Sequence, residues 1–330
     1  MKQYKHFFGV DVSKKTVDIT HAFEQKFTHR QFTNDDAGMK SLMGWLKEIN
    51  LDFLNTLFCM EATGLYCFPL TQFLAGNSID IWIEHAPQIK KANATARGKN
   101  DKIDSQRIAL YATKYPDRIR LWKPAGATLD KIRHLASLRE RLVETKKRLT
   151  NPINEFEDVG NIAMAKLLTK TIKNSLTAID KDLKSIESKI IDVVNEDDNL
   201  KLLYKLVTSV VGIGFVTAIN LLIHTNGFTM MKDVRKLACY CGVAPFEYSS
   251  GTSVRGKTKV HYMANKKLKS NLHMASLTAV KLDPDLKAYY ERKVAEGKNK
   301  MSVLNAVKNK LLARVIAVVN RQQEYVKKIA

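Results

Sequence analysis

The sequence predicts an α/β domain followed by a mostly helical remainder. Short apolar segments typical of strands alternate with helical segments as far as about residue 124, and from about Leu129 onward nearly all periodicity is helical. At 330 residues the chain is longer than one small core requires, which favours several domains. We place the domains at residues 1–124, 125–200 and 201–330.

The predicted elements of the first domain alternate strands with helices. We predict strands at residues 5–12, 16–22, 26–32, 54–60 and 79–83. We predict helices at residues 38–49, after a start signal at 34–36, and at 66–74. The run LNTLFCM at 54–60 is almost continuously apolar, as in a strand buried on both faces. This order of elements is that of an RNase H-like fold, in which the first and fourth strands are neighbours.

Two heptad-like patterns predict a pair of antiparallel coiled-coil helices within residues 125–200. Their apolar positions are Leu135, Leu138, Leu142 and Leu149, and then Ile172, Leu176, Ile179, Leu183, Ile186, Ile190 and Val193. Breaks are expected at Asn151-Pro152 and at 158–161. The pair serves as a spacer, as an oligomerisation arm, or as both.

The last domain is predicted to be mostly helical, with a loop at 242–256 that reads GVAPFEYSSGTSVRG. Before it, Gly212 and Gly214 separate two apolar helical segments. A helix-hairpin-helix turn, whose backbone N–H groups contact a phosphate, has this pattern, and so does a simple turn between helices.

The composition indicates the kind of partner. The formal net charge is +21, spread over every segment, which favours a nucleic acid over an anionic membrane surface. We find no signal peptide and no apolar stretch long enough to span a bilayer. The cysteines fit no zinc pattern and are expected to be reduced thiols of a cytoplasmic protein; they are Cys59, Cys67, Cys239 and Cys241.

Four acidic residues form the strongest candidate site. Asp11 ends the apolar run FFGV and Glu61 ends LFCM, whereas Asp101 and Asp104 share one face of the helix that they open. Neighbouring first and fourth strands would place Asp11 beside Glu61. Four such carboxylates suit two Mg²⁺ ions, which together can activate an attacking oxygen and stabilise a leaving one.

Each of these acids also has a simpler interpretation. Asp101 could be a helix N-cap and Asp104 the acid of a capping box, while Asp11 could close a turn and Glu61 could pair with a lysine. Other acids, such as Asp18 and those at 35–36, are expected to be ordinary exposed or helix-start residues.

The loop at 242–256 contains a pair of serines, Ser249 and Ser250. A serine hydroxyl becomes a good nucleophile only when a base or a metal removes its proton. The cations that follow it could neutralise a phosphate oxygen in a transition state; they are Arg255, Lys257 and Lys259. Taken alone, the sequence SSG is typical of a turn.

The segments GVDVSK, MEATG, DKIDSQR and GVAPFEYSSG, in this order and at these separations, resemble the DEDD transposases of the IS110 insertion-sequence family. The Piv DNA invertases are similar to that family. The resemblance covers nearly the whole chain and implies a RuvC-like domain, a coiled-coil linker and a C-terminal transposase domain. One stretch departs from the pattern: after the serines, KVHYMANKKLKSNL lacks the glycine of the family's Lys-x-Gly step.

The resemblance also implies roles for individual residues. Asp11, Glu61, Asp101 and Asp104 would bind Mg²⁺. Ser250 would be the nucleophile, with Ser249 as the adjacent fallback. The residues themselves, and not the resemblance, predict contacts with nucleic acid at Gly212, Gly214, Arg255 and Lys257.

The implied function is strand exchange of an insertion sequence through a transient phosphoserine bond. A noncoding RNA would pair with donor and target DNA, and protomers of a homo-oligomer, a dimer or a tetramer, would share active sites. Two other functions stay open. One is a RuvC-like junction resolvase that uses only the carboxylates, and the other is a non-catalytic nucleic-acid-binding protein.

Overall fold

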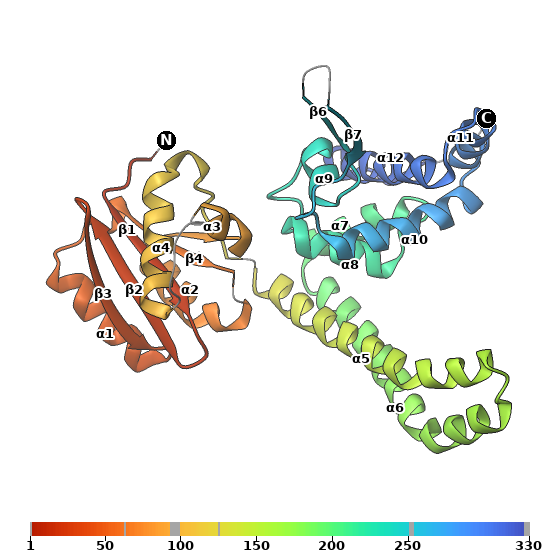
Figure 1. Ribbon diagram of the computed structural model, residues 1–330, viewed down its shortest axis with the longest axis horizontal. Coiled ribbons are helices and arrows are strands. Elements are labelled where there is room, and N and C mark those ends of the chain that lie inside the picture. Colours follow the sequence, from red (N-terminus) through yellow and green to blue (C-terminus); the bar gives the residue numbers. More distant parts are fainter. Residues whose placement is uncertain (1, 63, 93–99, 125, 251–253, 327–330) are drawn as a thin grey trace. The chain divides into compact units, whose positions relative to one another are not determined.

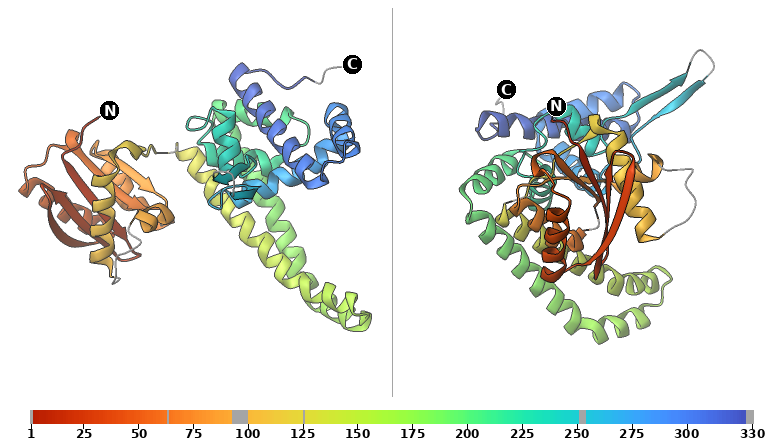
Figure 2. Two further views of the ribbon diagram at one scale, coloured as in Figure 1. Left: turned by 45° about the horizontal axis from the view of Figure 1, so that its top comes forward. Right: turned by 90° about the vertical axis from the view of Figure 1, so that its left-hand side faces the viewer.

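The computed structural model describes residues 2–62, 64–92, 100–124, 126–250 and 254–326; the side chains of 248–250, 254, 255, 257 and 259 lie outside this description. The chain divides into two compact units, Met1–Pro124 and Ala125–Ala330 (Figures 1 and 2). Each unit has its own hydrophobic core. The segments predicted as 125–200 and 201–330 belong to the same unit.

The first unit is built on a five-stranded sheet with the order β3-β2-β1-β4-β5 (Figure 1). Its strands are β1 (His6–Val12), β2 (Thr16–Phe23), β3 (Lys26–Thr33), β4 (Thr56–Glu61) and β5 (Asp80–Glu84). β2 is antiparallel to both of its neighbours, whereas β1, β4 and β5 are parallel to one another. The predicted strands are therefore present, and the predicted pairing of the first with the fourth is confirmed.

Helices cover both faces of this sheet. They are α1 (Asp36–Glu48), α2 (Phe68–Gly76), α3 (Ala86–Ala92) and α4 (Asp101–Lys114), with short 3-10 turns at η1 (Phe53–Asn55), η2 (Gly64–Cys67) and η3 (Pro116–Arg118). Side chains of α1 and α2 share a buried cluster with Phe8 and Val10 of β1. α4 lies on the opposite face, where its Ile108 packs against Leu57 and Cys59 of β4.

A glycine sets the height of α4 above the sheet. A Cβ atom built on Gly9 would lie 2.0 Å from the backbone nitrogen of Ala109 and 2.2 Å from the carbonyl oxygen of Ser105. No side chain fits there without moving the helix. The hydroxyls of Thr20 on β2 and Ser105 on α4 are 2.7 Å apart and complete this buried contact.

The second unit begins with two long antiparallel helices, α5 (Ala127–Asp158) and α6 (Ile162–Asn195) (Figure 1). Arg139 pairs with Glu187 at 2.7 Å across them. The predicted break at Asn151-Pro152 is wrong, because α5 continues through Pro152. A proline removes one hydrogen bond of the helix, and packing of the next residue, Ile153, which is buried, offsets that loss.

Most of the predicted seam is only half-buried in this pair of helices. Ile190 and Val193, at the inner end of α6, are buried and belong to the core of the second unit. Farther out, Ile172, Leu176 and Ile179 are half-buried, and Leu138 of α5 is exposed.

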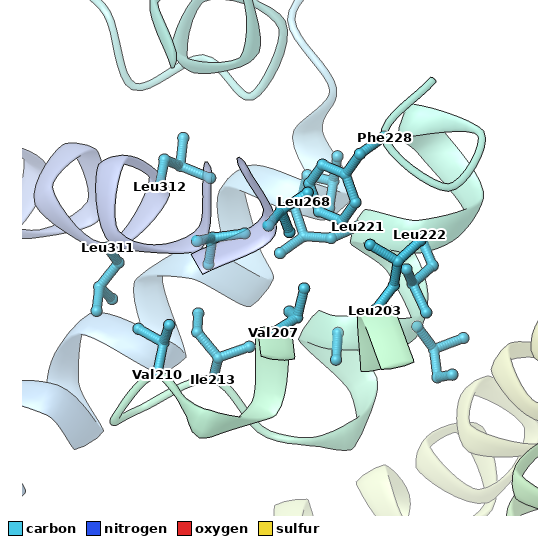
Figure 3. Close-up of a cluster of buried hydrophobic side chains, with 14 of the residues drawn as sticks. Leu203, Val207, Val210, Ile213, Leu221, Leu222, Phe228, Leu268, Leu311 and Leu312 are labelled. Atoms are coloured by element: carbon cyan, nitrogen blue, oxygen red, sulfur yellow. The ribbon is translucent and has the colours of Figure 1, made fainter. Parts of the chain in front are cut away.

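The remaining helices pack around one hydrophobic core, part of which Figure 3 shows. They are α7 (Asp198–Ser209), α8 (Phe215–Thr225), α9 (Val234–Tyr240), α10 (Lys266–Leu282), α11 (Pro284–Ala295) and α12 (Lys300–Arg321). Val207 and Leu222 come together with Leu268 of α10 and Leu311 of α12 (Figure 3).

The segment predicted as a loop at 242–256 is instead largely a β-hairpin. Its strands are β6 (Phe246–Ser250) and β7 (Val254–Lys259), which pair antiparallel and stand out from the helices (Figure 1). The glycines and serines of this segment are typical of loops, but residues 254–259 supply a partner for the backbone of β6. Pairing of the backbone therefore outweighs the weak strand preference of the side chains.

Two predictions concern disulfide bonds and membrane-spanning helices, which the sequence was expected to lack. No disulfide bond joins the cysteines at 59, 67, 239 and 241. Within the described ranges, no helix combines the length and the apolar composition that a bilayer crossing requires.

Candidate active site

Carboxylates form a row across four adjacent strands of the first unit. Asp11 of β1 is the cross-strand partner of Asp18 on β2. On the other side, Val10 pairs with Met60, which places Asp11 next to Glu61 at the end of β4, and Glu61 pairs with Glu84 on β5. Directly paired residues point to the same face of a sheet. The row therefore lies on the face that α4 covers.

The helix start adds two more acids near the end of β1. Asn100 is the N-cap of α4, and its side-chain oxygen accepts a hydrogen bond from the N–H of Ile103 at 2.7 Å. The interpretation of Asp101 as the N-cap is therefore wrong; Asp101 and Asp104 both lie in the first turn. Asp104 pairs with Arg107 at 3.0 Å.

The inner and outer members of the row differ in their partners. Asp18 accepts hydrogen bonds from His29 at 2.8 Å and Gln31 at 2.9 Å. Glu84 receives one from the hydroxyl of Tyr111 at 3.2 Å. Within the described part of the chain, no hydrogen bond or ion pair reaches the carboxylates of Asp11, Glu61 or Asp101. The middle of the row thus carries negative charge that the protein does not neutralise.

The pKa of Asp11 is affected by the neighbouring carboxylates. Burial, and to a lesser extent repulsion from Asp101, Asp104, Glu61 and Asp18, together raise the pKa of Asp11 to about 6. A carboxyl group surrounded by other carboxylates holds its proton more tightly unless a cation is bound. The four acids predicted from the sequence therefore lie close enough to act on one another.

Asp18 is the residue that sequence reasoning missed. It was expected to be an ordinary exposed acid, but it is only 3% exposed, because α4 covers this part of β2. The sequence held one signal, since Asp18 stands in TVDITHA between residues typical of strand interiors. The alternation of a strand does not show which face a later helix will cover. Glu84 was missed for the same reason.

The described residues contain no group of three or more His, Cys, Asp or Glu side chains drawn together as metal ligands. The donor chemistry nevertheless fits a hard divalent cation, which prefers carboxylate oxygens. No hydrogen bond or ion pair from another described residue would compete with such a cation for Asp11, Glu61 or Asp101, and a bound cation would offset the repulsion that helps to raise the pKa of Asp11.

The serines lie in the second unit and are placed by their backbone. Ser250 is the last residue of β6 and pairs with Val254, and Ser249 pairs with Arg255. The side chains of both serines, Arg255 and Lys257 lie outside the described residues. The predicted nucleophile is thus a strand-end residue of a projecting hairpin and not a residue of an irregular loop.

The turn between α7 and α8 contains the two predicted phosphate-binding glycines. Gly212 has a φ of +96°, and a Cβ atom on it would lie 2.6 Å from the carbonyl oxygen of Ala275 on α10. Close packing on α10 is therefore sufficient to require this glycine. Gly214 is the N-cap of α8 and faces open space, at a hollow of about 870 Å³ that Gly212 also lines. Both helices of the predicted turn are present.

Comparison with known proteins agrees with these features. A family model described as "Transposase IS116/IS110/IS902 family" matches residues 204–291, and the DEDD model of IS110, described as "Transposase", matches residues 8–156. The first match spans the serine hairpin, and the second spans the carboxylate row. These two matches define the class of the protein as a transposase.

Similar proteins extend the match over the whole chain. A pilin gene-inverting protein of Moraxella bovis is 25% identical over 98% of this chain and 99% of its own, and that of Moraxella lacunata is 26% identical over the same shares. The transposase for insertion sequence element IS1111A of Coxiella burnetii is 24% identical over 73% of this chain and 71% of its own. The chain belongs to the IS110 family of DEDD transposases.

Proposed function

We propose that this transposase exchanges DNA strands by means of two groups of residues, a Mg²⁺ site in the first unit and a serine nucleophile in the second. The observation that carries the proposal is the row of acids in the first unit. Asp11 and Glu61 end neighbouring strands, α4 adds Asp101 and Asp104, and the pKa of Asp11 responds to all of them. The sheet order β3-β2-β1-β4-β5 supports our assignment of residues 1–124 to an RNase H-like, RuvC-like domain.

In this proposal Asp11, Glu61, Asp101 and Asp104 hold the metal. Bound Mg²⁺ supplies charge stabilisation for the attacking and leaving oxygens of a phosphodiester. In this proposal the protein prepares the site by leaving Asp11, Glu61 and Asp101 without a hydrogen bond or ion pair from any other residue that the structure describes. Hydrogen bonds from His29 and Gln31 hold Asp18, which adds negative charge beside Asp11 without being free to move.

Ser250 supplies the nucleophile, with Ser249 as the alternative. Its Oγ forms a bond to phosphorus while the bond from phosphorus to one deoxyribose oxygen breaks, and the serine proton is transferred to that leaving oxygen. A hydroxyl of another strand then attacks the phosphoserine, which restores the serine. The cations of β7, Arg255 and Lys257, would stabilise the phosphate during both steps.

The partners of the reaction are donor and target DNA, and we propose that a noncoding RNA of the element selects both by base pairing. The net charge of +21 supports binding to nucleic acid. The half-buried apolar residues of α5 and α6 support a homo-oligomer, because a second copy could cover them. These helices then serve as a coiled-coil arm within residues 125–200, and residues 201–330 form the transposase domain of this proposal. We place the protein in the cytoplasm, where its DNA is.

The test is a search for a covalent protein–DNA adduct on a denaturing gel. The full chain is incubated with the noncoding RNA of its element, matching DNA and Mg²⁺, beside Ser250→Ala, Ser249→Ala and Asp11→Ala. An adduct that persists in Ser249→Ala and disappears in Ser250→Ala establishes the nucleophile. Cleavage without any adduct, unchanged in Ser250→Ala, would contradict the proposal and favour a resolvase that uses only the carboxylates.

A further inference from the structure

The root of the serine hairpin is held by two helices of the second unit. The side-chain amide of Asn305 on α12 donates a hydrogen bond to the carbonyl oxygen of Val243 at 2.7 Å. A Cβ atom on Gly242 would lie 2.7 Å from the Cβ of Ala264 and 3.5 Å from the Cδ of Lys269 on α10. α10 and α12 therefore meet the chain just before β6 begins.

A buried lysine lies one turn beyond Asn305. Lys308 is only 5% exposed, and it occupies a position in the apolar stripe of α12 between Leu304 and Leu311, which are both buried. Residues three apart on a helix share a face, so Lys308 and Asn305 belong to the same side of α12. A lysine at such a position is rare unless a charged or polar partner receives it.

No such partner is present for Lys308 in the part of the chain that the structure describes. Other cations of these helices have one: Lys267 pairs with Glu140 at 2.7 Å, and Arg314 pairs with Asp283 at 2.7 Å. The Nζ of Lys308 is not one of the fully buried polar atoms without a partner among the described residues, which are Asn34 Oδ1, Asn271 Nδ2 and His273 Nδ1.

The positive charge of Lys269 also acts on Lys308. Burial lowers the pKa of Lys308, and the positive charge of Lys269 lowers it further. Lys269 likewise has no ion pair with any described carboxylate. Packing alone does not require a charge here, because methionine or leucine would fill the stripe without the cost of burying an ammonium group. An anion between the two lysines would remove both their repulsion and that cost.

We infer that Lys308 and Lys269 bind a phosphate group of the DNA backbone at the root of the serine hairpin. The identity of the anion as a DNA phosphate rests on the proposed function. In that function the DNA strand must be held in place while a serine of β6 attacks it. The two lysines are binding residues in this scheme, because they position the strand and take no part in bond making.

The experiment has two arms, which use the full-length protein. In the first, thermal unfolding is followed with increasing inorganic phosphate at constant ionic strength. In the second, binding of a fluorescent DNA duplex is measured at several salt concentrations. The variants are Lys308→Met, which keeps the stem of the side chain, Lys308→Arg, which keeps the charge, and Lys269→Met. Lys300→Met is the matched control, because Lys300 is an exposed lysine at the start of the same helix.

We expect phosphate to raise the unfolding temperature of the wild type, Lys308→Arg and Lys300→Met, but not that of Lys308→Met. In the DNA arm, Lys308→Met and Lys269→Met should each bind more weakly. Each should also lower the slope of log affinity against log salt by about 0.9, the value for one phosphate contact. Lys300→Met should leave the slope unchanged.

The same phosphate response in Lys308→Met and the wild type would overturn the inference, whatever the DNA arm shows. A phosphate response that depends on Lys308 together with an unchanged DNA slope would overturn the assignment to DNA. In that case the second arm is repeated with an RNA duplex, and a change of slope there would assign the site to RNA. Neither result bears on the adduct formed by Ser250, so failure of the inference is distinguishable from failure of the proposed function.

Discussion

Among the described residues, each unit contains charged side chains without a partner, and the sign of that charge is opposite in the two units. In the first unit, the carboxylates of Asp11, Glu61 and Asp101 lie near one end of the sheet, and burial together with repulsion from the other acids raises the pKa of Asp11. In the second, Lys269 and Lys308 lie beside the root of the hairpin without an ion pair to any carboxylate that the structure describes. Uncompensated charge is costly in a folded protein unless a ligand of the other sign binds. On our proposals that ligand is Mg²⁺ in one unit and phosphate in the other.

If the first unit performs the chemistry and the second binds the DNA backbone, then removing a carboxylate should affect cleavage and not binding. This is the largest effect that we expect. Asp11→Ala should reduce strand cleavage by about a thousandfold or more, since several kcal/mol of metal-dependent stabilisation would be lost. Affinity for DNA, measured in parallel, should be nearly unchanged. The exposed Glu24→Gln in the same unit removes an equal charge and should cleave normally. Loss of binding in a correctly folded Asp11→Ala protein would contradict the assignment.

Binding by the basic residues should depend strongly on salt. If six or more phosphates are neutralised, affinity for a DNA duplex should fall by about a thousandfold or more between 50 and 200 mM salt. A titration at several salt concentrations measures this directly, and the Asp11→Ala variant should give the same slope as the wild type. An affinity that does not change with salt would show that the net charge of +21 is not used for DNA.

The position of α4 can be tested through Gly9. Gly9→Ala should lower the free energy of unfolding by about 1–3 kcal/mol or more, because the added methyl group meets the backbone of α4. Urea unfolding measures the change. Gly44→Ala is the control, since Gly44 lies within α1 and a Cβ there meets nothing within 4 Å. That change should stabilise the protein by about 0.5–1 kcal/mol. Equal effects of the two substitutions would contradict the close approach.

The raised pKa of Asp11 also has a consequence for stability without metal. The folded protein holds this proton more tightly than the unfolded chain does, since the pKa is about 6 against an ordinary value of 3.8. The destabilisation is therefore fully present above pH 6 and disappears as the pH falls below about 4. Asp11→Asn should stabilise the metal-free protein at pH 8 and have no such effect at pH 3.5. Thermal unfolding at the two pH values provides the comparison.

The smallest expected effect concerns Asp18. Asp18→Asn removes one of the charges that raise the pKa of Asp11, so that pKa should fall. At a limiting Mg²⁺ concentration, the pH at which binding reaches half of its maximum should then be lower than in the wild type. Because only one charge is removed, this pH should shift by less than about one unit. Glu24→Gln serves again as the control. A shift to higher pH would show that Asp18 acts in another way.

Some of the site could be predicted from the sequence because it depends on local patterns. The apolar runs that end at Asp11 and Glu61 identify two buried strands, and their order in the chain made these strands neighbours. The segment NDKIDSQ identifies a helix start with two acids in its first turn. The nearness of the four acids followed from these predictions, whereas the particular N-cap, Asn100, did not.

Other parts depend on contacts between distant segments. Asp18 becomes buried only because α4, more than eighty residues later, covers β2, and the alternation of a strand does not indicate which face a helix will cover. The serine segment forms a strand because a second strand pairs with it, although its composition is typical of a loop. Pairing of this kind is decided by the partner as much as by the segment itself.

Lys308 illustrates both the local patterns that the sequence contains and the contacts that only the tertiary structure provides. The helical spacing of Leu304, Lys308 and Leu311 is visible in the sequence and places a lysine within an apolar stripe. The sequence alone determined most of the helices and strands and the charged residues within them, because periodicity and strand or helix ends are largely local properties. Only the tertiary structure decided which of these charges are buried, and which have no partner, because burial and pairing depend on neighbours supplied by other segments of the chain.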